Sequence, residues 1–218
     1  MSHQPYTMNQ QFELNLIDNP SGEKGWNGWE RLSSGGDGFL IERTSSNEEF
    51  RGKSVPFHFA TSFGLCRKKY IVDLWAHGFE QKFLDEHRPP ITVSTNYKRS
   101  PHAGCTYILE AELVSDGGKI TAGERSLSNV GSGRWGQPTL IKLDPDKDTT
   151  TDTKIVRVRD MDEDSDTDWH YLEHTFTSYP PGIRYVIFVD SGKDTKFWKG
   201  HYGARMANAS VVVHKPNH

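Results

Sequence analysis

Cysteine is scarce: only Cys66 and Cys105 occur among the 218 residues. Two cysteines are too few for a disulfide framework or for a zinc site built from thiolates. Both lie in apolar runs that are typical of strands, so we expect two buried free thiols. A single bridge is the alternative if the two side chains face each other.

Long apolar runs are also lacking. No stretch of the sequence approaches the ~18–20 apolar residues that a membrane-spanning helix requires. Residues 1–11 are polar and lack the basic and apolar segments of a secretory signal peptide. No lipidation motif is present. We therefore expect a cytoplasmic protein without a membrane span.

Neither sign of charge is in strong excess. The chain has 26 Lys and Arg residues and 29 Asp and Glu residues, which give a formal net charge of -3. A protein that binds nucleic acid or a membrane surface would show a basic patch or a clear positive balance. We therefore expect no nucleic-acid partner.

Apolar residues recur with a period of two along most of the chain. In residues 105–114 the odd-numbered side chains are apolar and Thr106, Glu110 and Glu112 occupy the other face, as expected of a half-buried antiparallel strand. The odd-numbered residues of segment 183–189 repeat this pattern. Further strands are predicted at residues 55–59, 69–75, 39–42, 91–94, 139–143, 154–159, 171–177 and 209–214.

Glycine and proline clusters separate these segments, most clearly at residues 35–38, 116–118 and 180–182. Only residues 79–87 favour a helix. About ten strands without helical crossovers predict an all-β fold, a β-sandwich of two antiparallel sheets packed face to face.

The length of the chain suits a single β domain. We expect this domain at residues 12–214, between a flexible tail at residues 1–11 and a short tail at residues 215–218. Residues 119–168 are polar and rich in loop-type residues, which predicts a long insert in the domain.

Two features suggest metal binding but do not fit it well. The acidic run at residues 160–168 has carboxylates near the spacing of a calcium loop, but Thr167 stands where such a loop needs glycine. We therefore interpret the run as a solvated acidic loop. His170 and His174 lie four residues apart on a predicted strand, which is too far to share a metal. No metal or cofactor is expected.

Motifs of enzymes are also missing. The sequence has no nucleophile elbow, phosphate-binding loop or dinucleotide fingerprint. Asp37 lies in a glycine-rich turn, where an aspartate more often bonds to backbone N–H groups than acts as a catalytic acid. We assign no catalytic residue and predict that the chain is not an enzyme.

The most informative segment is residues 196–203, where Phe197, Trp198 and Lys199 follow a turn predicted at residues 191–192. Apolar residues in a loop are unusual unless they meet a ligand or the core. An indole stacks on the apolar C–H face of a sugar ring, and a lysine donates to its polar groups, so the segment indicates carbohydrate binding. The alternative is that one of the two rings caps the open end of the core.

Several short motifs occur in order along the chain. They are NLIDNP at residues 15–20, GGDG at 35–38, FATSFGLCRK at 59–68, IVDL at 71–74, AGC at 103–105, HTFT at 174–177, PGIR at 181–184, FWKG at 197–200 and GAR at 203–205. Together they resemble the F-box-associated (FBA) sugar-recognition domain family of glycoprotein-binding F-box-only proteins. The resemblance covers residues 12–214 and is specific as a combination.

This resemblance implies a jelly roll similar to galactose-binding domains, with loops at one end that grip the inner chitobiose of high-mannose N-glycans. The matching glycan-binding positions in this sequence are Phe63, Phe197, Trp198 and Lys199, with His102 nearby. By the resemblance, Trp198 would stack on a sugar face, and Phe63 and Phe197 would hold an N-acetyl methyl group. Lys199 would supply a hydrogen bond.

The sequence departs from the glycan-binding members of the family at three positions. Phe197 replaces a tyrosine, His102 replaces an aspartate and His201 replaces an aromatic residue. A lost hydrogen bond that leaves a polar partner unpaired would cost ~1–3 kcal/mol. These departures favour weaker sugar binding than that of the family's glycan binders.

The resemblance therefore predicts a non-catalytic, cytoplasmic lectin-like module that recognises N-glycans or glycoproteins. It implies a link to unfolded glycoproteins, ER-associated degradation and the ubiquitin pathway. The alternative is a glycan-blind protein-interaction scaffold of the same fold, with an immune-cell receptor role. The residues before the domain are too few to form an F-box, so we do not expect binding to a ligase adaptor.

Overall fold

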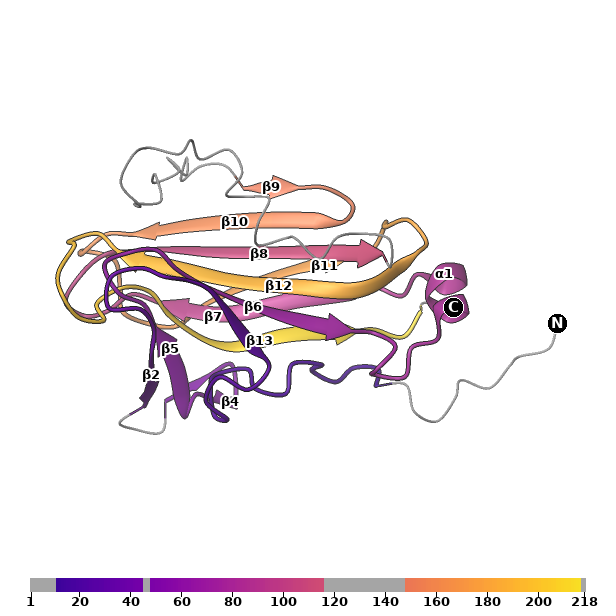
Figure 1. The fold of residues 1–218 in the computed structure, drawn as a ribbon, viewed down its shortest axis with the longest axis horizontal. Coiled ribbons are helices and arrows are strands. Elements are labelled where there is room, and N and C mark those ends of the chain that lie inside the picture. The colour runs from indigo at the N-terminus through magenta and orange to yellow at the C-terminus, as the bar shows by residue number, and fades with distance from the viewer. Residues whose placement is uncertain (1–10, 45–47, 116–147, 217–218) are drawn as a thin grey trace.

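The computed structural model describes residues 11–44, 48–115 and 148–216, which form two antiparallel sheets packed face to face (Figure 1). The larger sheet has the strand order β1 (Trp29–Ser34), β6 (Cys66–Asp73), β12 (Ile183–Asp194), β8 (Cys105–Ser115), β10 (Lys154–Met161) and β9 (Thr149–Thr150). The smaller sheet has the order β11 (His170–Phe176), β7 (Ile91–Lys98), β13 (Arg205–Val213), β5 (Phe57–Ala60) and β2 (Leu40–Arg43). The remaining elements are β3 (Glu49–Phe50), β4 (Lys53–Ser54) and helix α1 (Gln81–His87). The predicted all-β sandwich is confirmed.

Most of the predicted elements are present. Nine of the thirteen described strands correspond to segments predicted from the period of two, and the predicted helix is α1. The strand predicted at residues 139–143 lies outside the described residues. Strand β1 was not predicted, because its apolar residues serve different clusters: Trp29 packs in the core and Leu32 packs on the opposite face of the sheet.

Strand β8 is more buried than its sequence pattern indicates. Its odd-numbered face lies in the core as predicted, with Tyr107 and Leu109 fully buried. The opposite face is buried as well, since Ile108 is 4% and Glu110 is 6% exposed. The expectation of a half-buried strand was therefore wrong for β8.

The prediction for β12 had the right strand and the wrong face. Phe188 packs in the core, whereas Ile187 and Val189 belong to a separate cluster on the opposite face of the sheet. Ile183 does face the core, but a bulge between Ile183 and Tyr185 changes the register. Because side chains alternate along a strand, one inserted residue turns all later odd-numbered side chains outward.

The turn predicted at residues 191–192 is wrong. Strand β12 continues through Ser191 and Gly192 to Asp194 and pairs with β6 and β8 on either side. Gly192 is needed for packing, because a Cβ added there would lie 2.8 Å from the Cβ of Ala204. A glycine that permits close approach inside a strand gives the same signal in sequence as a glycine in a turn.

A lysine lies in the centre of the core. Lys68 on β6 is fully buried, and its Nζ lies 2.7 Å from Oδ2 of Asp190 on β12. The hydroxyl of Tyr107 on β8 donates to Oδ1 of Asp190 at 2.5 Å. Lys68 Nζ also lies 3.3 Å from the centroid of the Trp29 ring, and burial lowers the pKa of Lys68 to about 8. This cluster joins three neighbouring strands of the larger sheet.

The two cysteines are buried and free, as expected. Burial raises the pKa of the Cys66 thiol to about 11 and that of the Cys105 thiol to about 12. Both thiols are therefore protonated at neutral pH, which makes them poor nucleophiles.

Carboxylates of the acidic run at residues 160–168 accept hydrogen bonds within turns and form ion pairs. Asp162 Oδ1 accepts from the backbone N–H of Ser165 at 2.9 Å, and Asp166 lies 2.9 Å from Nε2 of His170. Within the part of the chain that the structure describes, no group of three or more His, Cys, Asp or Glu side chains could hold a metal ion.

Replacing Lys68 with methionine should destabilise the fold by about 3–5 kcal/mol, because the Asp190 carboxylate is then buried without a counter-charge. The double variant Lys68→Met, Asp190→Asn removes both charges, and its amide still accepts from Tyr107, so it should recover part of that loss. Urea denaturation measures both free energies of unfolding. A double variant no more stable than the single one would contradict this account of the pair.

Both thiols should resist alkylation in the folded protein, because only the thiolate attacks and raised pKa values leave little of it at about pH 8. Iodoacetamide should modify neither cysteine under native conditions and both in urea. Mass spectrometry counts the adducts. Rapid modification of either cysteine in the native protein would show that it is not buried.

Candidate functional site

Three loops meet at one end of the sandwich, at the left of Figure 1 and opposite α1. They are residues 35–39 after β1, residues 61–65 between β5 and β6, and residues 195–204 between β12 and β13. A fourth loop, residues 99–104, lies beside them, and its Gly104 carbonyl accepts from the N–H of Thr195 at 3.1 Å. All five glycan-binding positions implied by the resemblance lie on these loops, which we call the loop cluster.

A buried aspartate folds the loop after β12. Asp194 is fully buried, and its Oδ1 accepts from the backbone N–H groups of Lys196 at 2.9 Å and Phe197 at 2.6 Å. Its own N–H donates to the carbonyl of Ser62 at 3.0 Å. Phe197 has a φ of 58°, in the left-handed region that bulky residues rarely adopt. The fixed backbone leaves the Phe197 ring 61% exposed.

Three hydrogen bonds form a closed circuit among three of the loops. The N–H of Asp37 donates to Ser62 Oγ at 3.0 Å, and that hydroxyl donates to the carbonyl of Gly200 at 2.7 Å. The N–H of Gly200 then donates to Asp37 Oδ2 at 2.7 Å. Gly36 permits this approach, because a Cβ there would lie 2.8 Å from Ser62 Oγ. The role predicted for Asp37, hydrogen bonding to backbone, is confirmed.

The loop cluster presents aromatic rings to solvent. Trp198 is 49% exposed, and the ring of Tyr202 stands edge-on to it with 6.2 Å between centroids. Tyr202 is also edge-on to His102, at 5.9 Å. Tyr202 is not among the predicted residues, although it supplies, one position further on, the aromatic ring that His201 lacks.

The predicted residues differ in how closely the structure brings them together. Trp198 and His102 are linked through Tyr202, whereas Phe63 is joined to the cluster through the backbone of its loop. A Cβ on Gly36 would lie 3.0 Å from the Phe63 ring. Among the described residues, no ring contact joins Phe63 to another aromatic side chain. Lys199 is exposed at the tip of its loop.

Positive charge lies next to the exposed rings. Lys193 Nζ is 5.9 Å from the centroid of the Phe197 ring, and Lys196 Nζ is 5.8 Å from that of Trp198. Lys196 also forms an ion pair with Glu163. Ammonium groups near ring faces are held by the ring quadrupole and remain able to donate to a ligand's oxygen atoms.

These features suit binding by stacking and hydrogen bonding. The rings offer apolar faces, and the lysines offer donors beside them. The buried carboxylate of Asp194 and the carboxylate of Asp37 both accept hydrogen bonds from backbone N–H groups of the loops. The loop cluster therefore fits a polar ligand that has one apolar face.

The fold and the loop cluster define the class of protein: a β-sandwich domain whose loops at one end of the sheets expose aromatic rings. The enzymatically active domain of tailspike protein 4 from bacteriophage CBA120 has a similar fold, with a TM-score of 0.51 over 91% of this chain and 21% of that chain. The two are 10% identical, so the likeness shows the fold alone. None of the described helices is long and apolar enough to cross a membrane.

The chain belongs to the F-box associated region (FBA) family, whose profile matches residues 7–144 and 139–213. It is 33% identical to F-box only protein 6 of Rattus norvegicus, over 92% of this chain and 61% of that protein. It is 34% identical to F-box only protein 2 of Bos taurus, over 91% of this chain and 58% of that protein. The chain thus spans less than two thirds of the length of these relatives.

The variant Ser62→Ala should loosen the loop cluster. It removes the donor to Gly200 and the acceptor of Asp37, so the free energy of unfolding should fall by about 1–3 kcal/mol. Hydrogen exchange at the Asp37 amide should become faster. Ser54→Ala, at an exposed position in β4, is the control and should change neither quantity. Unchanged exchange at Asp37 in Ser62→Ala would contradict the circuit of hydrogen bonds.

Proposed function

We propose that this chain is a non-catalytic glycan-binding module whose loop cluster holds the inner chitobiose of N-linked glycans. The exposure of two adjacent rings, Phe197 at 61% and Trp198 at 49%, is the observation that carries the proposal. Their loop is fixed by Asp194, so the rings stay exposed without a ligand. A fixed surface of this kind loses little conformational entropy when it binds.

N-acetylglucosamine is complementary to this surface. The C–H face of its ring stacks on the indole of Trp198, where C–H groups meet the negative face of the π system. Its N-acetyl methyl group packs beside Phe197, and Phe63 lies on the neighbouring loop. Its hydroxyl and carbonyl oxygens accept hydrogen bonds from Lys199.

Stacking contributes more to this binding than polar contacts do. Phe197 has no hydroxyl group, so the donors and acceptors near Trp198 are Lys196, Tyr202 and, beyond Tyr202, His102. We therefore expect an affinity for free chitobiose of about 1 mM, which corresponds to ~4 kcal/mol of binding free energy. The carboxylates of the loop cluster hold the loops, and we assign no catalytic residue.

The relatives' names support a cellular role for such a module. F-box only protein 6 and F-box only protein 2 each match this chain over more than nine tenths of its length. We propose that the chain acts in the cytoplasm on glycoproteins whose unfolding exposes the inner sugars, in association with the ubiquitin pathway. Chitobiose lies next to the polypeptide, so a module that grips it distinguishes unfolded glycoproteins from folded ones.

Titration of the purified chain with chitobiose tests the proposal. Trp198→Ala should weaken binding at least about tenfold, or ~1.4 kcal/mol, because it removes the main stacking surface. Trp75→Ala is the matched control, since Trp75 is 64% exposed and follows β6 at the opposite end of the sandwich. Its removal should leave the affinity for chitobiose unchanged. Isothermal calorimetry measures both.

Two results would count against the proposal in different ways. Equal affinities of the unaltered chain and Trp198→Ala would place the sugar elsewhere on the surface. Absence of binding to the unaltered chain at several millimolar chitobiose would favour the alternative function, a glycan-blind protein-interaction scaffold of the same fold.

A further inference from the structure

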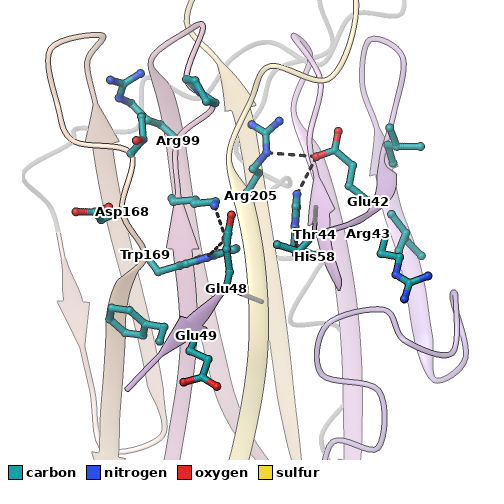
Figure 2. A pocket seen from close by; sticks show the side chains of 16 residues that line it. Glu42, Arg43, Thr44, Glu48, Glu49, His58, Arg99, Asp168, Trp169 and Arg205 are labelled. Carbon is teal, nitrogen blue, oxygen red and sulfur yellow. Dashed lines mark hydrogen bonds and ion pairs between the residues drawn. The ribbon is translucent and has the colours of Figure 1, made fainter. Parts of the chain in front are cut away.

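The outer face of the smaller sheet carries a groove of about 1040 Å³ (Figure 2). Side chains from β2, β5, β13 and β7 form its floor, and residues 48–50 and 167–169 form its walls. His58 and Arg205 line it, whereas their neighbours Phe59 and Met206 pack in the core on the other face. The groove is as large as the largest ordinary ligand pockets, which hold roughly 300–1,000 Å³.

Glu42 is the centre of one polar cluster in this groove. Its Oε2 lies 2.8 Å from Nε2 of His58 and 3.3 Å from Nε of Arg205. The hydrogen bond with His58 holds the pKa of Glu42 below its ordinary value, so the carboxylate is ionised at neutral pH. Nη1 of Arg205 is buried without a hydrogen-bond partner, and every contact of Glu42 with a described residue goes to Oε2.

Glu48 is the centre of a second polar cluster. Its Oε2 accepts from Nζ of Lys98 and from Nε1 of Trp169, both at 2.7 Å. As with Glu42, the contacts with described residues leave Oε1 unused. The rings of His58 and Trp169 meet edge-on at 5.9 Å, and Figure 2 shows the two clusters side by side on the sheet.

The formal charges of the groove cancel. Four carboxylates and four Lys or Arg side chains line it, with His58 as a further titratable group. Such a lining does not attract an ion from a distance, as a patch of one sign would. It offers acceptors and donors at close spacing, which suits a neutral ligand whose hydroxyl groups both donate and accept.

The groove and the loop cluster share the loop of residues 99–104. Arg99 and Pro101 line the groove, and the next residue, His102, contacts Tyr202 in the loop cluster. Arg205, the first residue of β13, directly follows the loop that carries Trp198. A ligand of several linked units could therefore occupy both surfaces.

We propose that this groove binds the outer hexose residues of the same N-glycan whose inner chitobiose lies at the loop cluster, an inference that rests on the proposed function. The loop cluster offers aromatic rings and the groove offers polar groups, so each suits a different part of the glycan. N-acetylated sugars carry methyl groups and meet the rings of Phe197 and Trp198. Mannose residues carry hydroxyl groups and no N-acetyl group, and they meet Oε1 of Glu42 and Oε1 of Glu48.

Calorimetric titrations with three ligands test this proposal: chitobiose, a high-mannose oligosaccharide that includes chitobiose, and a mannose oligosaccharide without it. The unaltered chain should bind the complete oligosaccharide at least about tenfold more tightly than chitobiose, because the two linked parts bind as one bivalent ligand. In Glu42→Ala this gain should disappear while the affinity for chitobiose stays the same.

A second groove variant leaves both polar clusters intact. Leu40 is 43% exposed at the groove, and in Leu40→Trp the indole, which is larger than the leucine side chain, would occupy part of the groove. This variant should also lose the gain in affinity for the complete oligosaccharide over chitobiose. Glu30→Ala is the control, because Glu30 pairs with Lys69 at 2.9 Å on the larger sheet, away from both surfaces. Glu30→Ala should bind the complete oligosaccharide as much more tightly than chitobiose as the unaltered chain does.

The outcomes separate the groove from the loop cluster. Equal affinities of the unaltered chain for chitobiose and the complete oligosaccharide would overturn the groove assignment, as would a full gain in both groove variants. If chitobiose fails to bind but the mannose oligosaccharide binds and Glu42→Ala abolishes that binding, the groove assignment stands and the loop cluster assignment fails. If no mannose-containing ligand responds to either groove variant, the groove assignment is wrong whatever chitobiose does.

Discussion

The salt bridge between Lys68 and Asp190 is the constraint on which the rest of the structure depends. Both side chains are at most 1% exposed and lie between the two sheets. A buried charge that loses its partner costs several kcal/mol, so β6 and β12 are held in the one register that pairs these residues. The hydroxyl of Tyr107 extends this constraint to β8. The centre of the larger sheet is thereby fixed by polar contacts inside an apolar core.

That register also positions the loop cluster. Asp194 lies four residues beyond Asp190 on the same face of β12, so the register that buries one also buries the other beneath the loop cluster. A shift of one residue would turn both carboxylates to the opposite face. The hydrogen bonds that Asp194 accepts hold the backbone at Phe197, which has a φ of 58°, and Trp198 is the next residue. The core and the loop cluster are therefore linked through one strand.

The sandwich and the helix could be predicted because they rest on local periodicity and turn chemistry, and the positions on the loop cluster were implied by the family resemblance. Predictions failed where a residue depends on a partner far away in the sequence. A bulge beyond Ile183 reversed the face of β12, and Gly192 serves close packing against Ala204 rather than a turn. The contact between Tyr202 and His102 has no signal in sequence spacing, and neither has the groove, because separate strands and loops build them.

A crystal structure of the chain with a high-mannose N-glycan oligosaccharide tests the central claim most directly. The account predicts an N-acetylglucosamine ring stacked on Trp198, with a following hexose within hydrogen-bonding distance of Oε1 of Glu42. Sugar bound elsewhere on the sandwich, with the loop cluster empty in the same crystal, would contradict it.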